Sequence, residues 1–315
     1  MPIELPILEE IHTSDVQGCA RRVQHRILGQ CDPGIPTAMF RGLLAGASLE
    51  HVHNEHRRAP DLAPEAVALG LVDTKAKMVS EGRSLTDGAV RNLDQTVAEC
   101  IKMCGYYIER FMPLFSQCEL IACELPIRWE MEHPLLEQSC HFASHLDLCF
   151  RDPENVWGHG ANRLHVWDWK WHKQSPSYAY LIRNMQMAIY YAAMGGGGAI
   201  LRNKKHDIWQ QPKEYPVVSW VHLPALMPYM RKTVGKSTDG EEKVFLKGDE
   251  RPLDRIVRNI GHNPDMVPYI ETTFAQHVLS MRMGIFLPSP DPVGCSLCPS
   301  EQWCQRYDYS LQLDG

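Results

Sequence analysis

The spacing of hydrophobic and polar positions divides the chain into helical and extended segments. From residue 88 to residue 115 the apolar side chains recur every three or four positions, which indicates an amphipathic helix. From residue 143 to residue 150 apolar and polar side chains alternate, which indicates a half-buried strand. The same reasoning predicts helices at 38–58, 63–82, 177–194 and 265–284 and strands at 118–130, 163–171 and 215–226. The turn signal Asp239-Gly240 predicts a hairpin at 234–246.

Two of the predicted strands carry charged side chains among apolar ones. Asp147 lies in the strand 143–150, and Asp168 and Lys170 lie on one face of the strand 163–171. Carboxylates on neighbouring strands suit a hard cation such as Mg²⁺ or Mn²⁺, which can activate a phosphodiester for cleavage. The tripeptide Asp-x-Lys is common, however, so these residues could also be ordinary strand charges near a solvated edge.

The helix predicted after these strands presents polar and aromatic groups on one side. Arg183, Gln186 and Tyr190 are spaced i, i+3 and i+7, so they form one stripe beside the acids. A guanidinium, an amide and a phenol in this position could bind phosphate and orient or stack on a single-stranded base. We therefore expect this stripe to contact DNA.

The cysteines are numerous, and three of them are closely spaced near the end of the chain. The sequence contains 11 cysteines, and Cys295, Cys298 and Cys304 follow a proline-rich turn in the pattern C-x2-C-x5-C. Thiolates at this spacing could hold an iron–sulfur cluster or zinc, or they could be idle thiols. Because no signal peptide is visible in the first residues, we expect metal binding rather than disulfides to explain at least a subset of them.

Composition sets limits on the class of protein. Apolar residues make up 44% and charged residues 22% of 315 residues, as in a globular protein, and no apolar run reaches membrane-spanning length. We therefore expect an intracellular, cytoplasmic protein without a membrane partner. Since the net charge is −6, any DNA contact must depend on local basic patches.

Taken in order, these motifs resemble those of a nuclease family. Asp147 matches motif II, Asp168-Trp169-Lys170 matches the D-x-K form of motif III, and Gln186 with Tyr190 matches the Q-x-x-x-Y motif of the PD-(D/E)XK superfamily. The chain is most similar to the RecB-like iron–sulfur exonuclease branch, which includes CRISPR-associated RecB-type nucleases and phage and viral relatives. The resemblance extends from about residue 13 to residue 305.

The resemblance implies an architecture. We expect one α/β domain over residues 1–315, with a restriction-endonuclease-like core in which helices flank a short mixed sheet. An iron–sulfur lobe would be built from both termini, at about 13–31 and 286–310. In this branch a cysteine near the first helix completes the ligand set, so the resemblance assigns a [4Fe–4S] cluster to Cys19, Cys295, Cys298 and Cys304.

The resemblance also assigns the catalytic metal. A histidine in a helix before the sheet acts as a ligand in this branch, and His51 extends the apolar stripe of the helix 38–58, whereas His53 points away from it. A core histidine is the alternative. Glu124 could supplement the acids, although an ordinary strand-edge charge is again the simpler interpretation. The implied ligands of Mg²⁺ or Mn²⁺ are His51, Asp147, Asp168 and the Trp169 carbonyl, with Lys170 as the catalytic cation.

These expectations lead to a function. The chain would be a Mg²⁺- or Mn²⁺-dependent deoxyribonuclease, an exonuclease acting on single-stranded DNA or DNA ends, and it could work within a repair, recombination or CRISPR-type complex. The alternative is a non-catalytic DNA-binding or assembly protein whose fold is stabilised by an iron–sulfur cluster or by zinc.

Overall fold

A computed structural model gives the fold of most of the chain. It describes residues 10–12, 34–55, 59–172, 177, 181, 184–195, 200–202, 208–210, 214–224, 231–236, 242–247 and 256–283. The expected iron–sulfur lobe and its ligands Cys19, Cys295, Cys298 and Cys304 lie outside these residues, as does Arg183.

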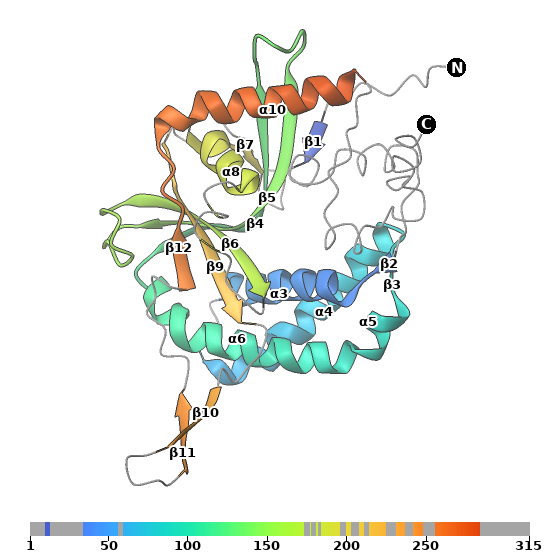
Figure 1. Cartoon of the computed structure of the whole chain (residues 1–315), viewed down its shortest axis with the longest axis vertical. Helices are drawn as coiled ribbons and strands as arrows, with labels where there is room; N and C mark the ends of the chain where they lie inside the picture. Colours follow the sequence, from blue (N-terminus) through green and yellow to red (C-terminus); the bar gives the residue numbers. More distant parts are fainter. Residues whose placement is uncertain are drawn as a thin grey trace.

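A curled mixed sheet forms the centre of the molecule (Figure 1). Its strands follow the order β12-β9-β6-β5-β4-β7-β8, and β1 also pairs with β5. The pairs β6–β9 and β1–β5 are parallel and the others are antiparallel. The strands are β1 (Glu10–His12), β4 (Glu119–Met131), β5 (Cys140–Asp152), β6 (Arg163–His172), β7 (Ile200–Arg202), β8 (Ile208–Gln210), β9 (Val217–Pro224) and β12 (Val257–Asn259).

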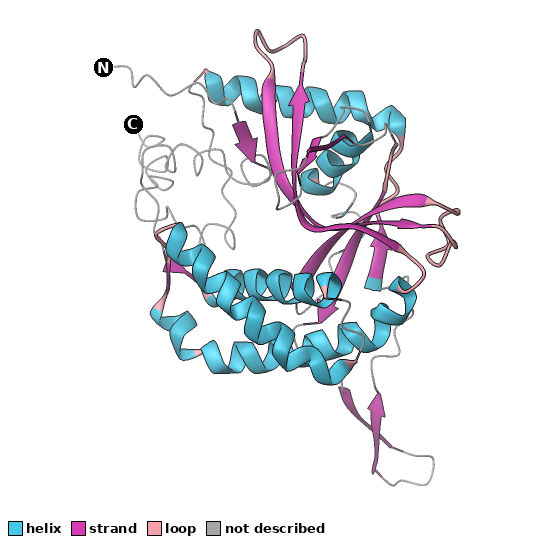
Figure 2. Ribbon diagram, turned by 180° about the vertical axis from the view of Figure 1, so that it is seen from behind, coloured by secondary structure: helices cyan, strands magenta, loops and turns pink. Residues whose placement is uncertain are grey.

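Helices cover the sheet on two sides (Figures 1 and 2). One layer contains α3 (Thr37–Asn54), α4 (Ala63–Ser80), α5 (Asp87–Arg91) and α6 (Leu93–Phe115). The other contains α8 (Met185–Gly195) and α10 (Val267–Arg282). Short elements complete the described chain: the paired strands β2 (Gly34–Ile35) and β3 (Ser84–Leu85), the paired strands β10 (Arg231–Lys236) and β11 (Glu242–Lys247), and the 3-10 helices η1 (Pro60–Leu62) and η2 (Pro264–Met266).

Each layer of helices packs against one face of the sheet and forms a separate hydrophobic core with it. The apolar stripe predicted for residues 88–115 is buried in α6, where Cys104 and Ile108 have no exposed surface. This helix packs with α3 and α4 against Trp167, Trp169 and Trp171, which occupy alternate positions of β6. On the other side, α8 and α10 pack against Leu164 and Val166 of the same strand, among others. Strand β6 is thus buried on both faces, which fixes the side chains it carries.

The sheet opens in the middle of β5 and β6. Their backbone pairing runs from Asp152↔Arg163 to Leu148↔Trp167 and stops there. Beyond this point β6 continues beside β9, whereas β5 continues beside β4 and β1 (Figure 2). The two strands therefore diverge at the residues that follow the last pair, and these are Asp147 and Asp168.

The predicted α/β class agrees with this mixed sheet flanked by helices. The predicted strands correspond to β4, β5, β6 and β9, most predicted helices lie where the hydrophobic pattern placed them, and the hairpin expected at 234–246 corresponds to β10 and β11. The short strands β1, β7, β8 and β12 were not predicted. The helix expected from residue 177 is described as α8 only from Met185. None of the described helices has the length and apolar character needed to cross a membrane.

Candidate active site

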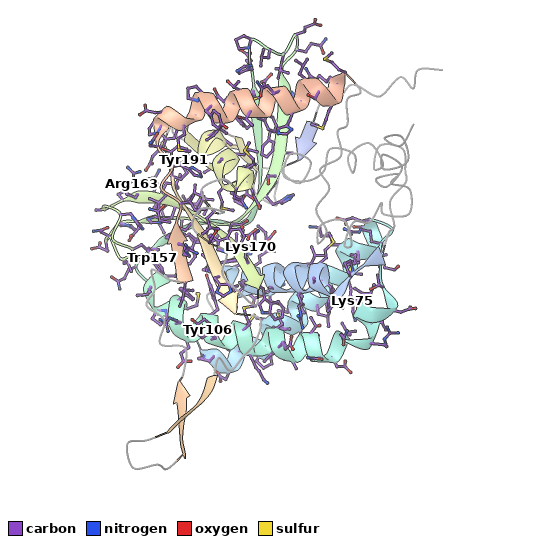
Figure 3. All side chains as sticks on the ribbon, in the orientation of Figure 1. Lys75, Tyr106, Trp157, Arg163, Lys170 and Tyr191 are labelled. Atoms are coloured by element: carbon purple, nitrogen blue, oxygen red, sulfur yellow. The ribbon has the colours of Figure 1, made fainter. Side chains whose placement is uncertain are left out.

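The acids and the lysine of the D-x-K motif meet where β5 and β6 diverge. The Nζ of Lys170 lies 2.5 Å from Oδ2 of Asp168, whose side chain has no exposed surface. About a quarter of the Lys170 side chain remains exposed, at the centre of the molecule (Figure 3). The pair is therefore anchored in the core at its carboxylate end, and the lysine side chain is partly exposed.

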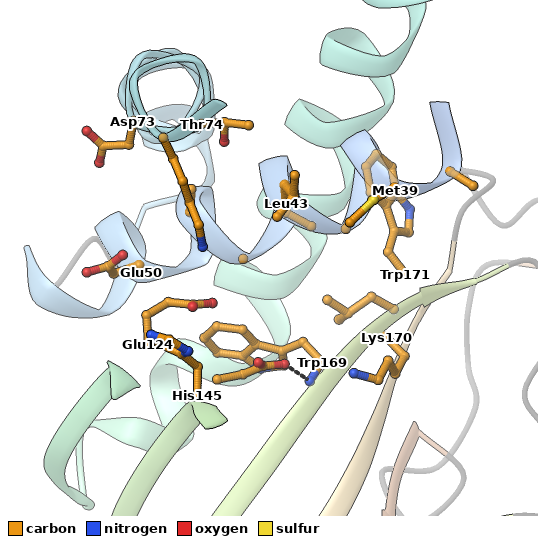
Figure 4. A pocket seen from close by; sticks show the side chains of 18 of the residues that line it. Met39, Leu43, Glu50, Asp73, Thr74, Glu124, His145, Trp169, Lys170 and Trp171 are labelled. Carbon is orange, nitrogen blue, oxygen red and sulfur yellow. Dashed lines mark hydrogen bonds between the residues drawn. The ribbon is translucent and has the colours of Figure 1, made fainter. Parts of the chain in front are cut away.

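Asp147 is tied to the same motif through a backbone bond. The amide N–H of Trp169 donates to Oδ2 of Asp147 at 2.5 Å, the bond drawn as a dashed line in Figure 4. The backbone pairing between β5 and β6 ends at Leu148 and Trp167, and this bond joins the two strands just beyond that point. The divergence of the strands thus frees a backbone donor, and the Asp147 carboxylate accepts from it.

The charges of this group are strongly coupled. Burial raises the pKa of Asp147 well above the ordinary value, and the charges of Asp168 and Glu124 raise it further against the opposing effect of Lys170. Burial lowers the pKa of Lys170, but the carboxylates of Asp168 and Asp147 outweigh that effect, so the net shift is upward. Lys170 is therefore an ammonium at neutral pH and acts as a fixed positive charge.

The two residues of the Q-x-x-x-Y motif link Asp168 to the backbone of β5 through hydrogen bonds. The Nε2 of Gln186 donates to Oδ1 of Asp168 at 3.1 Å and to the hydroxyl of Tyr190 at 2.6 Å. The Tyr190 hydroxyl in turn donates to the backbone oxygen of His145 at 2.7 Å. Since Tyr190 has no exposed surface, its ring cannot stack on a DNA base. The geometry fits a role in positioning Asp168 better than the expected contact with DNA.

A cavity of about 760 Å³ lies between the sheet and helices α3 and α4, and Asp147 and Lys170 line it (Figure 4). Its walls include four acids but only two lysines. A phosphodiester would meet a net negative surface there unless a cation entered with it. These charged residues of the wall are Glu50, Asp73, Glu124 and Asp147, with Lys77 and Lys170.

Glu124 reaches this cavity through an unusual backbone conformation. It lies on β4 with φ of 50°, in the left-handed region that non-glycine residues seldom adopt. Its carboxylate faces α3 at Gly46, where an added Cβ would lie 2.7 Å from Oε1 (Figure 4). A glycine in the helix and a kinked strand together direct Glu124 towards Asp147. Sequence reasoning gave this residue a minor role, because no sequence pattern signals a left-handed glutamate within a strand.

The two histidines of α3 are arranged differently from the prediction. His51 is bound to Glu55 at 3.1 Å and to Asp73 at 2.8 Å, and it does not belong to the described wall of the cavity. His53, which was expected to point away from the buried face, is buried instead. That interpretation was wrong, because α3 packs on two elements at once: His53 bonds to Tyr107 of α6 at 2.8 Å and stacks on Trp169 of β6.

The acidic residues at and near the cavity are of the chemical type that binds hard divalent cations. Asp147 and Glu124 line the cavity, Asp168 is bound to Lys170, and all three carry carboxylates, which are ligands that Mg²⁺ and Mn²⁺ prefer. The crowding of carboxylates in a net negative cavity also favours a cation. Among the described residues, however, no group of three or more His, Cys, Asp or Glu side chains is placed so that it could hold a metal ion. The ammonium of Lys170 already neutralises part of the negative charge of Asp168.

Comparison with known proteins identifies the family of the chain. The sequence profile of the PD-(D/E)XK nuclease superfamily matches residues 14–305, which is nearly the whole chain. No curated protein matches. Among solved structures, the chain is similar to the one titled "Crystal structure of SSO0001", with 9% identity, a TM-score of 0.34, and coverage of 94% of this chain and 86% of that one. On the family match, the chain belongs to the PD-(D/E)XK nuclease superfamily.

Proposed function

We propose that this chain is a metal-dependent DNA exonuclease that acts on single strands or DNA ends. The observation that carries the proposal is the pair formed by Lys170 and the buried Asp168 beside Asp147, at the point where two strands separate. A nuclease is what the family match supports, and the carboxylates supply the ligands for Mg²⁺ or Mn²⁺.

The size of the cavity supports a single-stranded substrate. A volume of about 760 Å³ is that of a pocket for a drug-sized ligand, so it suits one or two unpaired nucleotides rather than a continuous duplex. An unpaired strand end can enter such a cavity between α3 and the sheet. A cavity that admits a strand end suits an exonuclease, so we propose exonuclease rather than endonuclease activity.

The roles of the residues follow from their positions. Asp147, Asp168, Glu124 and the Trp169 carbonyl would hold the cation, which when bound would supply Lewis-acid activation of the phosphate and of the attacking water. Lys170 holds its positive charge at the site, so it can orient the water and stabilise the charge that develops on the phosphate. Gln186 fixes the rotamer of Asp168. We do not assign His51 as a ligand, because Glu55 and Asp73 hold its ring.

The iron–sulfur cluster is a separate part of the proposal. It rests on the spacing of Cys295, Cys298 and Cys304, with Cys19 as the fourth ligand. An absorbance spectrum with iron and sulfide assays on anaerobically purified protein tests it. Broad absorbance near ~400 nm with about four irons supports the cluster. Stoichiometric zinc in a colourless protein removes it and leaves the nuclease proposal unchanged.

A labelled single-stranded DNA tests the catalytic proposal. We expect cleavage with Mg²⁺ or Mn²⁺, no cleavage with EDTA, and a loss of at least ~10²-fold in Asp168→Asn and Lys170→Gln, as when a charge-stabilising donor is removed. The exposed Lys102 of α6 provides the matched control, and Lys102→Gln should retain the wild-type rate. Full activity in Asp168→Asn would overturn the mechanism. DNA binding without any cleavage by the wild type would favour the non-catalytic alternative.

A further inference from the structure

The cavity beside the D-x-K motif has two ends of different chemical character. Its wall changes along helix α3, because Met39 lies near the beginning of the helix and Glu50 near its end, about 16 Å further on. Figure 4 shows Met39 and Trp171 on one side of the cavity and Glu50 and Asp73 on the other. The first side, here called the apolar end, is formed by Ala38, Met39, Leu43, Trp171 and Leu223.

Met39 and Leu43 present accessible surface at the apolar end. Met39 is 40% exposed and lies about one helical turn before the partly buried Leu43, so both side chains occupy the same face of α3. Apolar surface that lines a cavity and is not packed in the core is available to a ligand. The thioether of Met39 also packs well against the ring of an aromatic group. These side chains therefore suit a flat, apolar ligand.

Trp171 and Met39 are held in place by two arginines. The Nη2 of Arg41 donates to Oε2 of Glu99 on α6 at 2.6 Å, and the guanidinium carbon of Arg41 lies 5.8 Å from the centroid of the Trp171 ring. The Nη2 of Arg83 donates to the sulfur of Met39 at 3.3 Å. Side chains that are already fixed lose little conformational entropy when a ligand packs against them. The apolar end is thus preorganised for binding.

The apolar end lies next to the charged groups of the proposed cleavage site. Lys170 precedes Trp171 in β6, and both residues line the cavity. A ligand that uses both ends must carry a phosphate for the ammonium of Lys170 and an apolar ring a short distance away. A nucleotide has both groups, whereas an inorganic phosphate lacks the ring.

We propose that the apolar end binds the base of the terminal nucleotide of a DNA strand whose adjoining phosphodiester reaches Lys170. This inference rests on the proposed function, which supplies the strand and its end. The apolar end offers aliphatic, thioether and indole surface, and not the paired donors and acceptors that read the edge of a base. Stacking accepts any base, because every base has a π-face. The subsite therefore requires a base without selecting its identity.

A fluorescent mononucleotide tests the subsite directly. The 5′-monophosphate of 2-aminopurine deoxyribonucleoside contains no phosphodiester, so Mg²⁺ can be present without cleavage. Its emission should fall on binding to the wild type, because stacking quenches 2-aminopurine. Met39→Ala combined with Leu43→Ala should bind it at least ~10-fold more weakly, as when apolar groups are lost from a hydrophobic pocket. The matched control, Leu69→Ala with Met283→Ala, removes exposed side chains outside the described wall of the cavity and should keep wild-type affinity.

Competition separates the contribution of the base from that of the phosphate. We expect dAMP and dCMP to displace the probe with similar affinities, and deoxyribose 5-phosphate, which lacks a base, to compete at least ~10-fold more weakly. Equal competition by deoxyribose 5-phosphate would overturn the inference, because the phosphate alone would then account for binding. Wild-type affinity in the Met39 and Leu43 variant would overturn it too. Circular dichroism verifies folding, and Met39→Ala alone, at an exposed position, replaces the double variant if that variant does not fold.

Oligonucleotides with an abasic terminal nucleotide carry the test to the cleavage reaction. The abasic residue is placed at the 5′ end of one oligonucleotide and at the 3′ end of another. For the wild type, kcat/KM should fall at least ~10-fold with one of the two, and that one identifies the strand end that enters the cavity. The double variant should cleave the intact and the abasic ends at similar rates. Equal cleavage of all three substrates by the wild type would contradict the inference.

The two proposals can fail separately. If the wild type binds the mononucleotide through its base but does not cleave DNA, the nuclease proposal falls and the base subsite stands. If the wild type cleaves DNA but does not bind the mononucleotide, or binds it as the double variant does, the base subsite falls and the nuclease proposal stands.

Discussion

A Cβ on Gly46 would lie 2.7 Å from the Oε1 of Glu124. Gly46 thus leaves room on α3 for a carboxylate that comes from β4, and this contact places Glu124 in the wall of the cavity beside Asp147. A helix glycine ordinarily costs about 0.5–1 kcal/mol relative to alanine. Its presence here indicates that the position is shaped by the glutamate rather than by helix stability.

Replacing Gly46 by Ala separates these two effects. The methyl group favours the helix but displaces the Glu124 carboxylate, so we expect at least tenfold weaker Mn²⁺ binding by calorimetry and a comparable loss of cleavage rate. Gly42 lies one turn earlier on α3, where a Cβ would meet nothing within 4 Å. Gly42→Ala should therefore keep wild-type Mn²⁺ affinity and gain some stability. Equal behaviour of the two variants would exclude Glu124 from the metal site.

The raised pKa of Asp147 predicts how stability depends on pH. The folded protein binds a proton at this carboxyl more readily than the unfolded chain does. Stability is therefore lost as the pH rises from the unfolded value of about 3.9 through the raised folded value. Asp147→Asn avoids this loss and can still accept the bond from Trp169, so its Tm should exceed that of the wild type at pH 7 to 8.

Thermal unfolding followed by circular dichroism between pH 4 and pH 8 measures this difference. The difference in Tm between Asp147→Asn and the wild type should decrease as the pH falls, because the wild-type carboxyl then becomes protonated. A gap that stays constant over the whole range would mean that titration of Asp147 is not its cause. Added Mn²⁺ should raise the Tm of the wild type more than that of the variant.

Tyr190 provides a test of positioning against DNA contact. Its buried hydroxyl links Gln186 to the backbone of His145, so Tyr190→Phe loosens Gln186 and, through it, Asp168. We expect kcat to fall about tenfold with KM for DNA unchanged, because the interaction lost does not involve the substrate. Steady-state kinetics on a labelled oligonucleotide measures both constants. An increase in KM at constant kcat would instead support the direct contact with DNA.

Substitution of the two histidines of α3 should change the unfolding free energy by different amounts. His53→Ala removes a buried ring from between Tyr107 and Trp169, and we expect a loss of about 2–4 kcal/mol in unfolding free energy. His51→Ala removes only partly exposed contacts with Glu55 and Asp73, so its effect should be less than ~1 kcal/mol. Urea unfolding measures both. Loss of Mn²⁺ affinity in His51→Ala would restore His51 as a metal ligand.

The sequence predicted the parts of the site that depend on local periodicity. Alternation in β5 and β6 was enough to place Asp147, Asp168 and Lys170 on neighbouring strands, and the structure joins Asp168 to Lys170. The burial of His53 depends on how α3 packs against α6 and β6, which the pattern of α3 alone does not contain. Glu124 depends on a left-handed backbone angle, and the buried state of Tyr190 depends on the depth of α8 in the core.

The parallel pairing of β6 with β9 also bears on when the protein becomes active during its synthesis. Asp168 lies beside Trp220 and Lys170 beside His222, so the strand that secures them is made about fifty residues after them. Contacts of this sequence separation form late in folding, because the intervening chain must first be ordered. A ribosome-bound chain that ends before β9 lacks the neighbour that holds the acids and the lysine in place. Nascent chains should therefore be inert towards nucleic acid until β9 has emerged.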